Sequence, residues 1–457
     1  MTPINDEFFE KLLDEFENQN PIIENYEITL TENISIDVSR KSYEFRNCIF
    51  KGARIDFYDF DNSNENKHEF HTLSFKDCEI ENDLFIKDCK LYQLLFQNIK
   101  ITSRNFFISS SYIQNISLTG KPDSYNLIDS LLITDLLGNE INLDVRLTQI
   151  NNFNINDSKF DFVMINKNKF GMLHISNSTF NGETQFWRNI ITGYLSIRKS
   201  TFNNLEAKES DFGKEIIFEG NDFLGNCNFE NSKNDNITSF KIEKCNFNKY
   251  VYFDNSKLFS ILIDSTFFKE MVSFQDTVFN RIKFNRTHFE KIAYFNNIQI
   301  SAKNDLDLNT VRTIKTQLLK TENKIDYLEF KKYEFELYRK SLDKNKNGSR
   351  AILWLNKVTS DYNTNWITGV VFTLGYGYIF YQILYLLVFG LSDADMWEKN
   401  RFWTGYFKYL IIPNFNSPFT DNGLDRWYQF LFFIIGKIAI TYGAYETIQS
   451  FRKYGKA

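Results

Sequence analysis

A large apolar residue returns at nearly every fifth position between Phe153 and Ile300, and this spacing limits the possible folds more than any other feature. From Phe160 the series continues as Ile165, Phe170, Ile175 and Phe180, with occasional single-residue slips further on. Small residues often stand two positions earlier, as at Ser158, Ser178, Ser200, Ser210, Cys245, Ser256, Thr266, Thr277 and Thr287. A helix repeats about every 3.6 residues and a strand about every 2.0 residues. Neither element alone can therefore keep these residues on one face.

A coil with four sides can place them all inside. If each five-residue unit forms one side, four sides close a turn of about 20 residues, and successive turns stack at roughly 4.8 Å. The large residue and the residue two before it then point inward, and the slips become bulges at the corners. Residues one turn apart should stack in the core, which we expect to include Phe160, Phe180, Phe202, Phe223, Phe247, Phe268 and Phe289.

This pattern resembles the pentapeptide-repeat family in a divergent, Phe-rich form. The resemblance covers more than half of the chain and implies a right-handed quadrilateral β-helix, a mainly β fold. Counting the regular stretches gives on the order of 11 turns at one strand spacing each. Some members of the family resemble B-form DNA and inhibit gyrase. Here basic and acidic residues are nearly balanced from Asp157 to Lys291, so we expect no DNA mimicry and no nucleic-acid partner.

The five cysteines, Cys48, Cys78, Cys89, Cys227 and Cys245, each stand two residues before an inward position. We therefore expect small buried wall residues, which suit a reducing compartment. The four histidines are scattered, and the sequence holds no Gly-rich phosphate loop and no Ser-His-Asp arrangement. We expect no enzyme activity, no metal and no cofactor.

The order of these patterns predicts four regions. An N-terminal helix and solenoid cap should occupy residues 1–40, and the solenoid should occupy 41–300 with insertions near 61–70 and 119–148. The second insertion reads as a turn followed by a short helix or irregular segment. A helical linker over 301–358 should fold as a hairpin that turns near Asn323, because helical periodicity stands on both sides of it. Its segment IDYLEFKKYEFELYRKSL resembles the linker of bacterial pentapeptide-repeat membrane proteins.

Residues 359–457 should form a membrane domain. The first predicted span, 366–390, has no charged residue, and the second lies near 427–447. Basic residues flank both outer ends and no export signal precedes the β region, which favours a bacterial inner-membrane protein with both termini cytoplasmic. The segment 402–413 reads as interfacial or re-entrant. The C-terminal string YETIQSFRKYGK resembles the ending of uncharacterised bacterial membrane proteins.

Five residues in the predicted spans are candidates for pore lining or helix packing. Lys437 places a cation within an apolar segment, where it either faces a polar partner or water, or snorkels to the membrane surface. Ala439 and Gly443 form a small-xxx-small pair that suits helix association and oligomers. Gly375 and Gly377 belong to a TLGYG string close to a potassium-channel filter, but no span precedes it, so we expect a packed helix.

Two functions fit these features. The first is an interaction scaffold, in which a cytoplasmic β-helix anchored in the lipid bilayer binds a protein partner or a second copy. The second is an oligomeric membrane effector or pore, for example in bacterial antiphage (antiviral) defence. Both remain open from the sequence.

Overall fold

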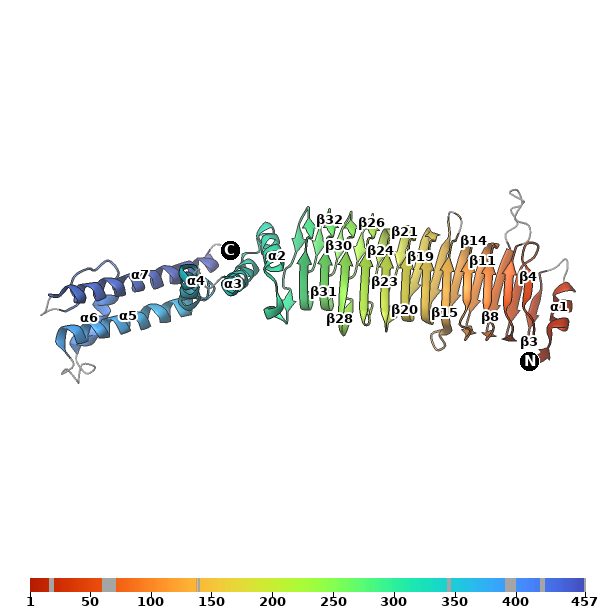
Figure 1. Ribbon diagram of the computed structural model, residues 1–457, viewed down its shortest axis with the longest axis horizontal. Coiled ribbons are helices and arrows are strands. Elements are labelled where there is room, and N and C mark those ends of the chain that lie inside the picture. The colour runs from red at the N-terminus through yellow and green to blue at the C-terminus, as the bar shows by residue number, and fades with distance from the viewer. Residues whose placement is uncertain are drawn as a thin grey trace. The chain divides into compact units, whose positions relative to one another are not determined.

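The computed structural model describes residues 1–15, 20–59, 71–136, 138, 140–342, 347–390, 400–419 and 424–455 (Figure 1). The chain divides into two compact units, Met1–Leu306 and Asp307–Ala457, and each is described by itself. The first unit is a parallel β-solenoid of about 13 turns.

Two parallel sheets run along the solenoid. The first sheet contains β1 (Thr2–Ile4), β3 (Tyr26–Leu30), β4 (Ile34–Asp37), β6 (Ile49–Gly52), β7 (Ile55–Tyr58), β9 (Glu79–Ile80), β10 (Leu84–Lys87), β12 (Lys100–Ile101), β13 (Phe106–Ser109), β15 (Asn126–Thr134), β17 (Thr148–Asn156), β20 (Lys169–Ser176), β22 (Ile190–Ile191), β23 (Tyr194–Arg198), β25 (Glu215–Glu219), β28 (Lys233–Glu243), β31 (Lys257–Asp264), β34 (Val278–Asn285) and β37 (Gln299–Ile300). The second contains β2 (Ile22–Glu24), β5 (Tyr43–Arg46), β8 (His71–Lys76), β11 (Lys90–Gln97), β14 (Tyr112–Thr119), β16 (Asn142–Arg146), β18 (Lys159–Phe160), β19 (Phe162–Asn166), β21 (Thr179–Gln185), β24 (Thr201–Glu206), β26 (Asp222–Phe223), β27 (Cys227–Asn228), β29 (Asn246–Phe247), β30 (Val251–Tyr252), β32 (Phe267–Phe268), β33 (Val272–Ser273), β35 (His288–Phe289) and β36 (Ala293–Tyr294).

Each turn points pairs of side chains inward, one pair from each side. In one turn the buried pairs are Val251 and Phe253, Ser256 and Leu258, Ile261 and Ile263, and Thr266 and Phe268. The residue between the two members of a pair faces outward because side chains alternate along a strand. The mainly β solenoid predicted from the five-residue spacing is therefore confirmed.

The predicted phenylalanines form one continuous column. Ring centroids are 5.6 Å apart for Phe160 and Phe180, and 4.4 Å apart for Phe180 and Phe202. The column continues through Phe223, Phe247, Phe268 and Phe289 with centroid distances of 5.5, 4.5, 4.8 and 5.1 Å. Near-parallel rings in neighbouring turns bury a large apolar area and hold the turns in register.

Two corners of most turns carry buried polar side chains that form ladders along the solenoid, and we call them ladder corners. The hydroxyl of Ser200 accepts a hydrogen bond from the Ser178 main-chain N–H (3.2 Å), and the Asn189 side chain accepts one from the Asn168 N–H (3.0 Å). These bonds give the buried backbone donors of a corner a partner in the next turn. Small residues were expected here from the sequence, whereas the asparagines of the same ladders were not.

The residue that enters a ladder corner often has a left-handed backbone. Asn177, Arg188, Lys199 and Glu209 have φ angles of 50°, 55°, 48° and 56°. Register shifts occur at the other two corners, which we call open corners, between Leu91 and Gln93, Phe180 and Glu183, and Asn234 and Ser239. All three register shifts, which correspond to the predicted bulges, therefore lie at open corners.

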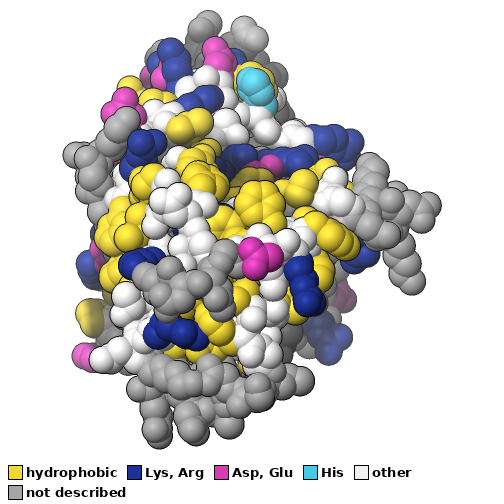
Figure 2. Space-filling view, turned by 90° about the vertical axis from the view of Figure 1, so that its left-hand side faces the viewer, with side chains coloured by type: hydrophobic (Ala, Val, Ile, Leu, Met, Phe, Trp, Pro, Cys, Tyr) yellow, Lys and Arg dark blue, Asp and Glu magenta, His cyan; other side chains and the backbone are white. Residues whose placement is uncertain are grey.

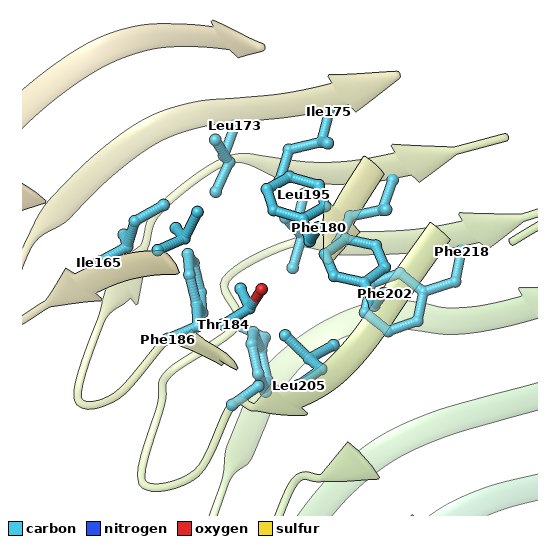
Figure 3. A pocket seen from close by; sticks show the side chains of 14 residues that line it. Ile165, Leu173, Ile175, Phe180, Thr184, Phe186, Leu195, Phe202, Leu205 and Phe218 are labelled. Atoms are coloured by element: carbon cyan, nitrogen blue, oxygen red, sulfur yellow. The ribbon is translucent and has the colours of Figure 1, made fainter. Parts of the chain in front are cut away.

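A small closed cavity of about 20 Å³ lies inside the solenoid (Figure 3). Its walls are aliphatic and aromatic, and Thr184 supplies a single hydroxyl that points among them (Figure 3). That Oγ1 atom is buried without a hydrogen-bond partner among the described residues. One polar atom is too few to hold a buried water, which needs two to four partners.

The N-terminal helix α1 (Asp6–Asp14) covers the first turns of the solenoid. Asn5 caps it by accepting a hydrogen bond from the Phe8 main-chain N–H (3.2 Å). Phe9 is fully buried, with ring centroids 6.5 Å from Phe45 and 6.3 Å from Phe50. An apolar lid of this kind closes the open end of a solenoid core.

The structure corrects three expectations about the solenoid. It begins at β2 rather than at residue 41, because Ile23 and Ile28 already continue the inward series. The segment expected as an excursion within 119–148 contains β15 and β16, which pair with neighbouring turns. Leu132 faces outward between inward Leu131 and Ile133, an alternation that a contiguous apolar run hides. These additions raise the count from about 11 turns to about 13. The insertion near 61–70 lies outside the described residues.

All five cysteines are buried and free, as expected. Burial raises the pKa of Cys245 to about 11 and raises the pKa of Cys227 well above its ordinary value. Both thiols stay protonated near neutral pH and are therefore poor nucleophiles.

The second unit is helical. It contains α2 (Leu308–Lys320), α3 (Lys324–Ser341), α4 (Asn347–Ser360), α5 (Trp366–Phe389), α6 (Asn400–Leu410) and α7 (Trp427–Gly455). Helices α2 and α3 form the expected hairpin, and Asn323 caps α3 by accepting from the Asp326 main-chain N–H (3.2 Å). Glu334 ties the hairpin together through Arg312 (2.9 Å) and Lys315 (2.5 Å). Burial opposes its charged form, but these two hydrogen-bonded partners outweigh burial and lower the pKa of Glu334.

Candidate functional site

Helices α5 and α7 are the two described helices long and apolar enough to cross a membrane, over Trp366–Phe389 and Trp427–Arg452. They pack antiparallel, because Gly369 lies against Thr447, Gly443 against Thr373, and Gly436 against Phe380. A Cβ added at any of these glycines would collide with the opposing residue. Small residues thus let the two backbones approach closely, as in helix pairs within membranes.

Lys437 lies in the middle of this packing and is only 3% exposed. Its Nζ donates hydrogen bonds to the main-chain carbonyls of Tyr409 and Ile411, both at 2.7 Å. The ammonium also lies 5.3 Å from the centroid of the Tyr409 ring and 5.6 Å from that of Phe433. A helix ends in unpaired carbonyls and a partial negative charge, so the lysine of α7 stabilises the end of α6.

Helix α6 is held by its aromatic side chains. The Tyr406 hydroxyl donates to the Leu374 carbonyl of α5 (2.8 Å), and the Tyr409 hydroxyl donates to the Phe433 carbonyl of α7 (3.3 Å). Together with Tyr381, Tyr385, Phe402, Phe419 and Phe433 they form one buried cluster. The segment expected as interfacial or re-entrant is therefore a short helix with one face packed on both long helices.

The outside of this part of the unit is apolar, unlike that of a water-soluble bundle, and several polar side chains are buried. Val371 of α5 is 64% exposed and Ile438 of α7 is 63% exposed, whereas Gln429, Lys437 and Glu446 are buried. Figure 2 looks onto the end that carries α6, where hydrophobic side chains cover much of the surface among Lys and Arg side chains. Exposed residues here include Trp403, Phe407, Ile411, Phe415 and Trp427. Apolar side chains are stable on the outer surface of these helices if lipid hydrocarbon surrounds them.

The other sequence candidates have different surroundings. Gly377 lies against Leu410 and Ile440, and Gly443 against Thr373 and Phe372, so both serve packing inside one chain. Gly375 has no neighbour within 4 Å of an added Cβ, and Ala439 is half-buried. The TLGYG string is helical throughout, as expected, and therefore does not present the extended carbonyls of a filter.

Sequence reasoning missed a polar contact between α4 and α7. The Ser360 hydroxyl donates to a carboxylate oxygen of Glu446 (2.7 Å), and the Tyr442 hydroxyl donates to the side-chain carbonyl of Asn356. Tyr442 and Glu446 are one helical turn apart, and so are Asn356 and Ser360. Polar residues four positions apart in both helices were the sequence signal for this contact.

In the part of the chain that the structure describes, no group of three or more His, Cys, Asp and Glu side chains could hold a metal ion. No protein-family model, curated protein or solved structure matches this chain. Its class follows from the fold: a mainly β solenoid followed by helices, two of which could span a membrane.

Proposed function

We propose that this protein is a membrane-anchored interaction scaffold of the pentapeptide-repeat type, in which α5 and α7 cross a bilayer and the solenoid presents a binding surface. The observation that carries the proposal is the apolar outside of α5 and α7, with Val371 and Ile438 exposed and Lys437 and Glu446 buried. A water-soluble bundle would expose the two charged side chains and bury the two apolar ones.

Extraction of membranes tests the anchor. The full chain should stay in the pellet after alkaline carbonate treatment, and a chain that ends at Leu306 should be soluble with a β-rich circular dichroism spectrum. The truncated chain is the matched control, because it keeps the whole solenoid. Recovery of the full chain in the soluble fraction would overturn the anchor.

We place the protein in a bacterial inner membrane with both termini in the cytoplasm. Arg350 and Lys357 precede α5, and Arg452 follows the apolar part of α7, so basic residues flank both outer ends. A C-terminal fluorescent protein that folds only in the cytoplasm should fluoresce. A C-terminal alkaline phosphatase, which is active only outside, should be inactive. The opposite pair of results would reverse the orientation.

Binding by the solenoid is proposed at an exposed apolar pair, Met172 and Tyr194, which lie side by side on two successive turns. Scattered apolar residues are normal on surfaces, but neighbouring ones mark contact sites for proteins. A photo-crosslinking amino acid at Tyr194 should capture a discrete protein partner in cells. The same amino acid at the outward Gln275 is the control, and equal crosslinking at both positions would contradict binding at the apolar pair.

We favour an anchor over a pore and propose no enzymatic role. Lys437 donates to two carbonyls of its own chain, so its charge already has partners without an aqueous path. Purified protein in liposomes should therefore carry no ion flux. A flux whose ion selectivity changes in Lys437→Glu would replace the scaffold with the membrane effector.

A further inference from the structure

Helix α4 turns its polar side toward the protein. Asn356 accepts from the Tyr442 hydroxyl and Ser360 donates to Glu446, so both residues face α7. Thr359 and Ser360 are fully buried. In a helix that faces water on one side, these polar residues would normally lie on the exposed side.

The outward side of α4 is apolar. Ala351, Trp354, Leu355 and Val358 follow the i, i+3, i+4, i+7 spacing of one helical face, and Ile352 stands beside them. Trp354 is 49% exposed and Ile352 is 63% exposed. Water would not favour exposed apolar side chains at these positions. The packing of α4 on α5 and α7 does not explain them either.

The charges around α4 suit a membrane surface. Arg350 and Lys357 lie along the border of the apolar stripe, and the sequence of the helix holds no Asp or Glu. Lys357 also pairs with Glu336 of α3 at 2.7 Å. A helix with an apolar face, a basic border and no acid fits an interface with anionic lipid headgroups.

Exposed aromatic side chains also mark the end of the spans that follows α4 in the chain. Trp366 begins α5 and stacks on Phe451 near the end of α7, with ring centroids 4.9 Å apart, and both rings are partly exposed. Aromatic side chains of this kind mark the level of the headgroups at the end of a membrane helix. The α4 contacts at Glu446 and Tyr442 lie within about three helical turns of Phe451, so α4 meets α7 near this aromatic end.

We propose that α4 lies in the headgroup layer of the bilayer as an interfacial helix, with the stripe Ala351, Trp354, Leu355 and Val358 turned into the lipid. This inference rests on the proposed membrane anchor and adds a lipid-binding surface outside the two spans. The occupant is lipid rather than a second protein, because α4 leads directly into the span α5, carries Arg350 and Lys357 beside the stripe and holds no Asp or Glu.

Spin labels on introduced cysteines test this in the full chain reconstituted in vesicles that contain anionic phospholipid. The five natural cysteines are buried, so labelling is confined to the introduced sites. The test sites are Trp354→Cys and Val358→Cys. Val371→Cys on α5 serves as the lipid control, and Glu322→Cys in the turn between α2 and α3 serves as the water control. Collision rates with oxygen and with a water-soluble nickel complex give the surroundings of each label.

We expect labels 354 and 358 to collide more with oxygen and less with nickel than label 322, with an oxygen preference below that of label 371. Labels 354 and 358 that resemble label 322 while label 371 reports lipid would overturn the interfacial helix and leave the anchor. Low collision rates with both reagents, with broadening between labels, would assign the stripe to a second copy instead. A water signal at label 371 would overturn the anchor itself.

Discussion

The side-chain ammonium of Lys437 donates a hydrogen bond to the main-chain carbonyl of Tyr409 at 2.7 Å, so a charge in one long helix closes the end of a neighbouring short one. A lysine in an apolar segment is costly, and this bond, with the second one to Ile411, offsets the cost. Lys437, a candidate for pore lining or helix packing from the sequence, makes a contact between α7 and α6.

Lys437→Met should therefore destabilise the helical unit by about 2 kcal/mol, because it removes two charge-assisted hydrogen bonds and leaves the carbonyls of α6 unpaired. This differs from a lone buried charge, whose removal would be neutral or stabilising. Thermal unfolding of the full chain in detergent measures the effect. Lys408→Met, on α6 itself, is the control and should change stability little. Equal stability of Lys437→Met and wild type would contradict the contact.

Thr184→Val should stabilise the solenoid by about 1 kcal/mol, because it replaces a buried hydroxyl without a partner by a methyl group of the same size. Thr277→Val is the matched control. The Thr277 hydroxyl donates to the Phe253 carbonyl at 2.7 Å, so its loss should destabilise by about the same amount. Shifts of the same sign in the two variants, measured by urea unfolding, would refute the difference between the two hydroxyls.

A single glycine inserted after Asp276 should destabilise the solenoid by about 3 kcal/mol, because it displaces Thr277 and Phe279 from their ladders. Asp276 enters a ladder corner with φ of 55°. The same insertion after Glu270, at an open corner of the same turn, should cost about 1 kcal/mol or less, since open corners already absorb register shifts. Thermal unfolding of the two variants checks the ranking, and equal losses would show that the corners do not differ.

Acid should weaken the hairpin of α2 and α3 through Glu334. Its pKa is lowered in the folded state, so its contribution is present above the ordinary glutamate pKa of about 4.3 and is lost as the pH falls through the folded value. Glu334→Gln should cost about 1 kcal/mol at neutral pH and nothing at the acid end. Melting temperatures of both chains across this pH range measure the difference. A constant difference at all pH values would exclude the carboxylate as the cause.

The sequence by itself determined the solenoid and its inward register. Residues such as Phe180 and Phe202 are fixed by a spacing that only a closed coil can satisfy, and all parallel pairing then follows from stacking equal turns. The hairpin turn at Asn323 and the two long apolar helices could also be predicted from the sequence, because helical periodicity and length are local properties.

Only the tertiary structure decided which polar residues have partners. Thr184 and Thr277 look alike in the sequence, yet only one hydroxyl meets a carbonyl of the neighbouring turn. Leu132 is part of a continuous apolar run in the sequence, but in the structure it pairs with Phe107 and faces outward. The hydrogen-bond partner of Lys437 is likewise the end of α6, at Tyr409, which lies 28 residues earlier in the chain. Hydrogen bonds depend on distances between such segments, and the order of residues alone does not contain those distances.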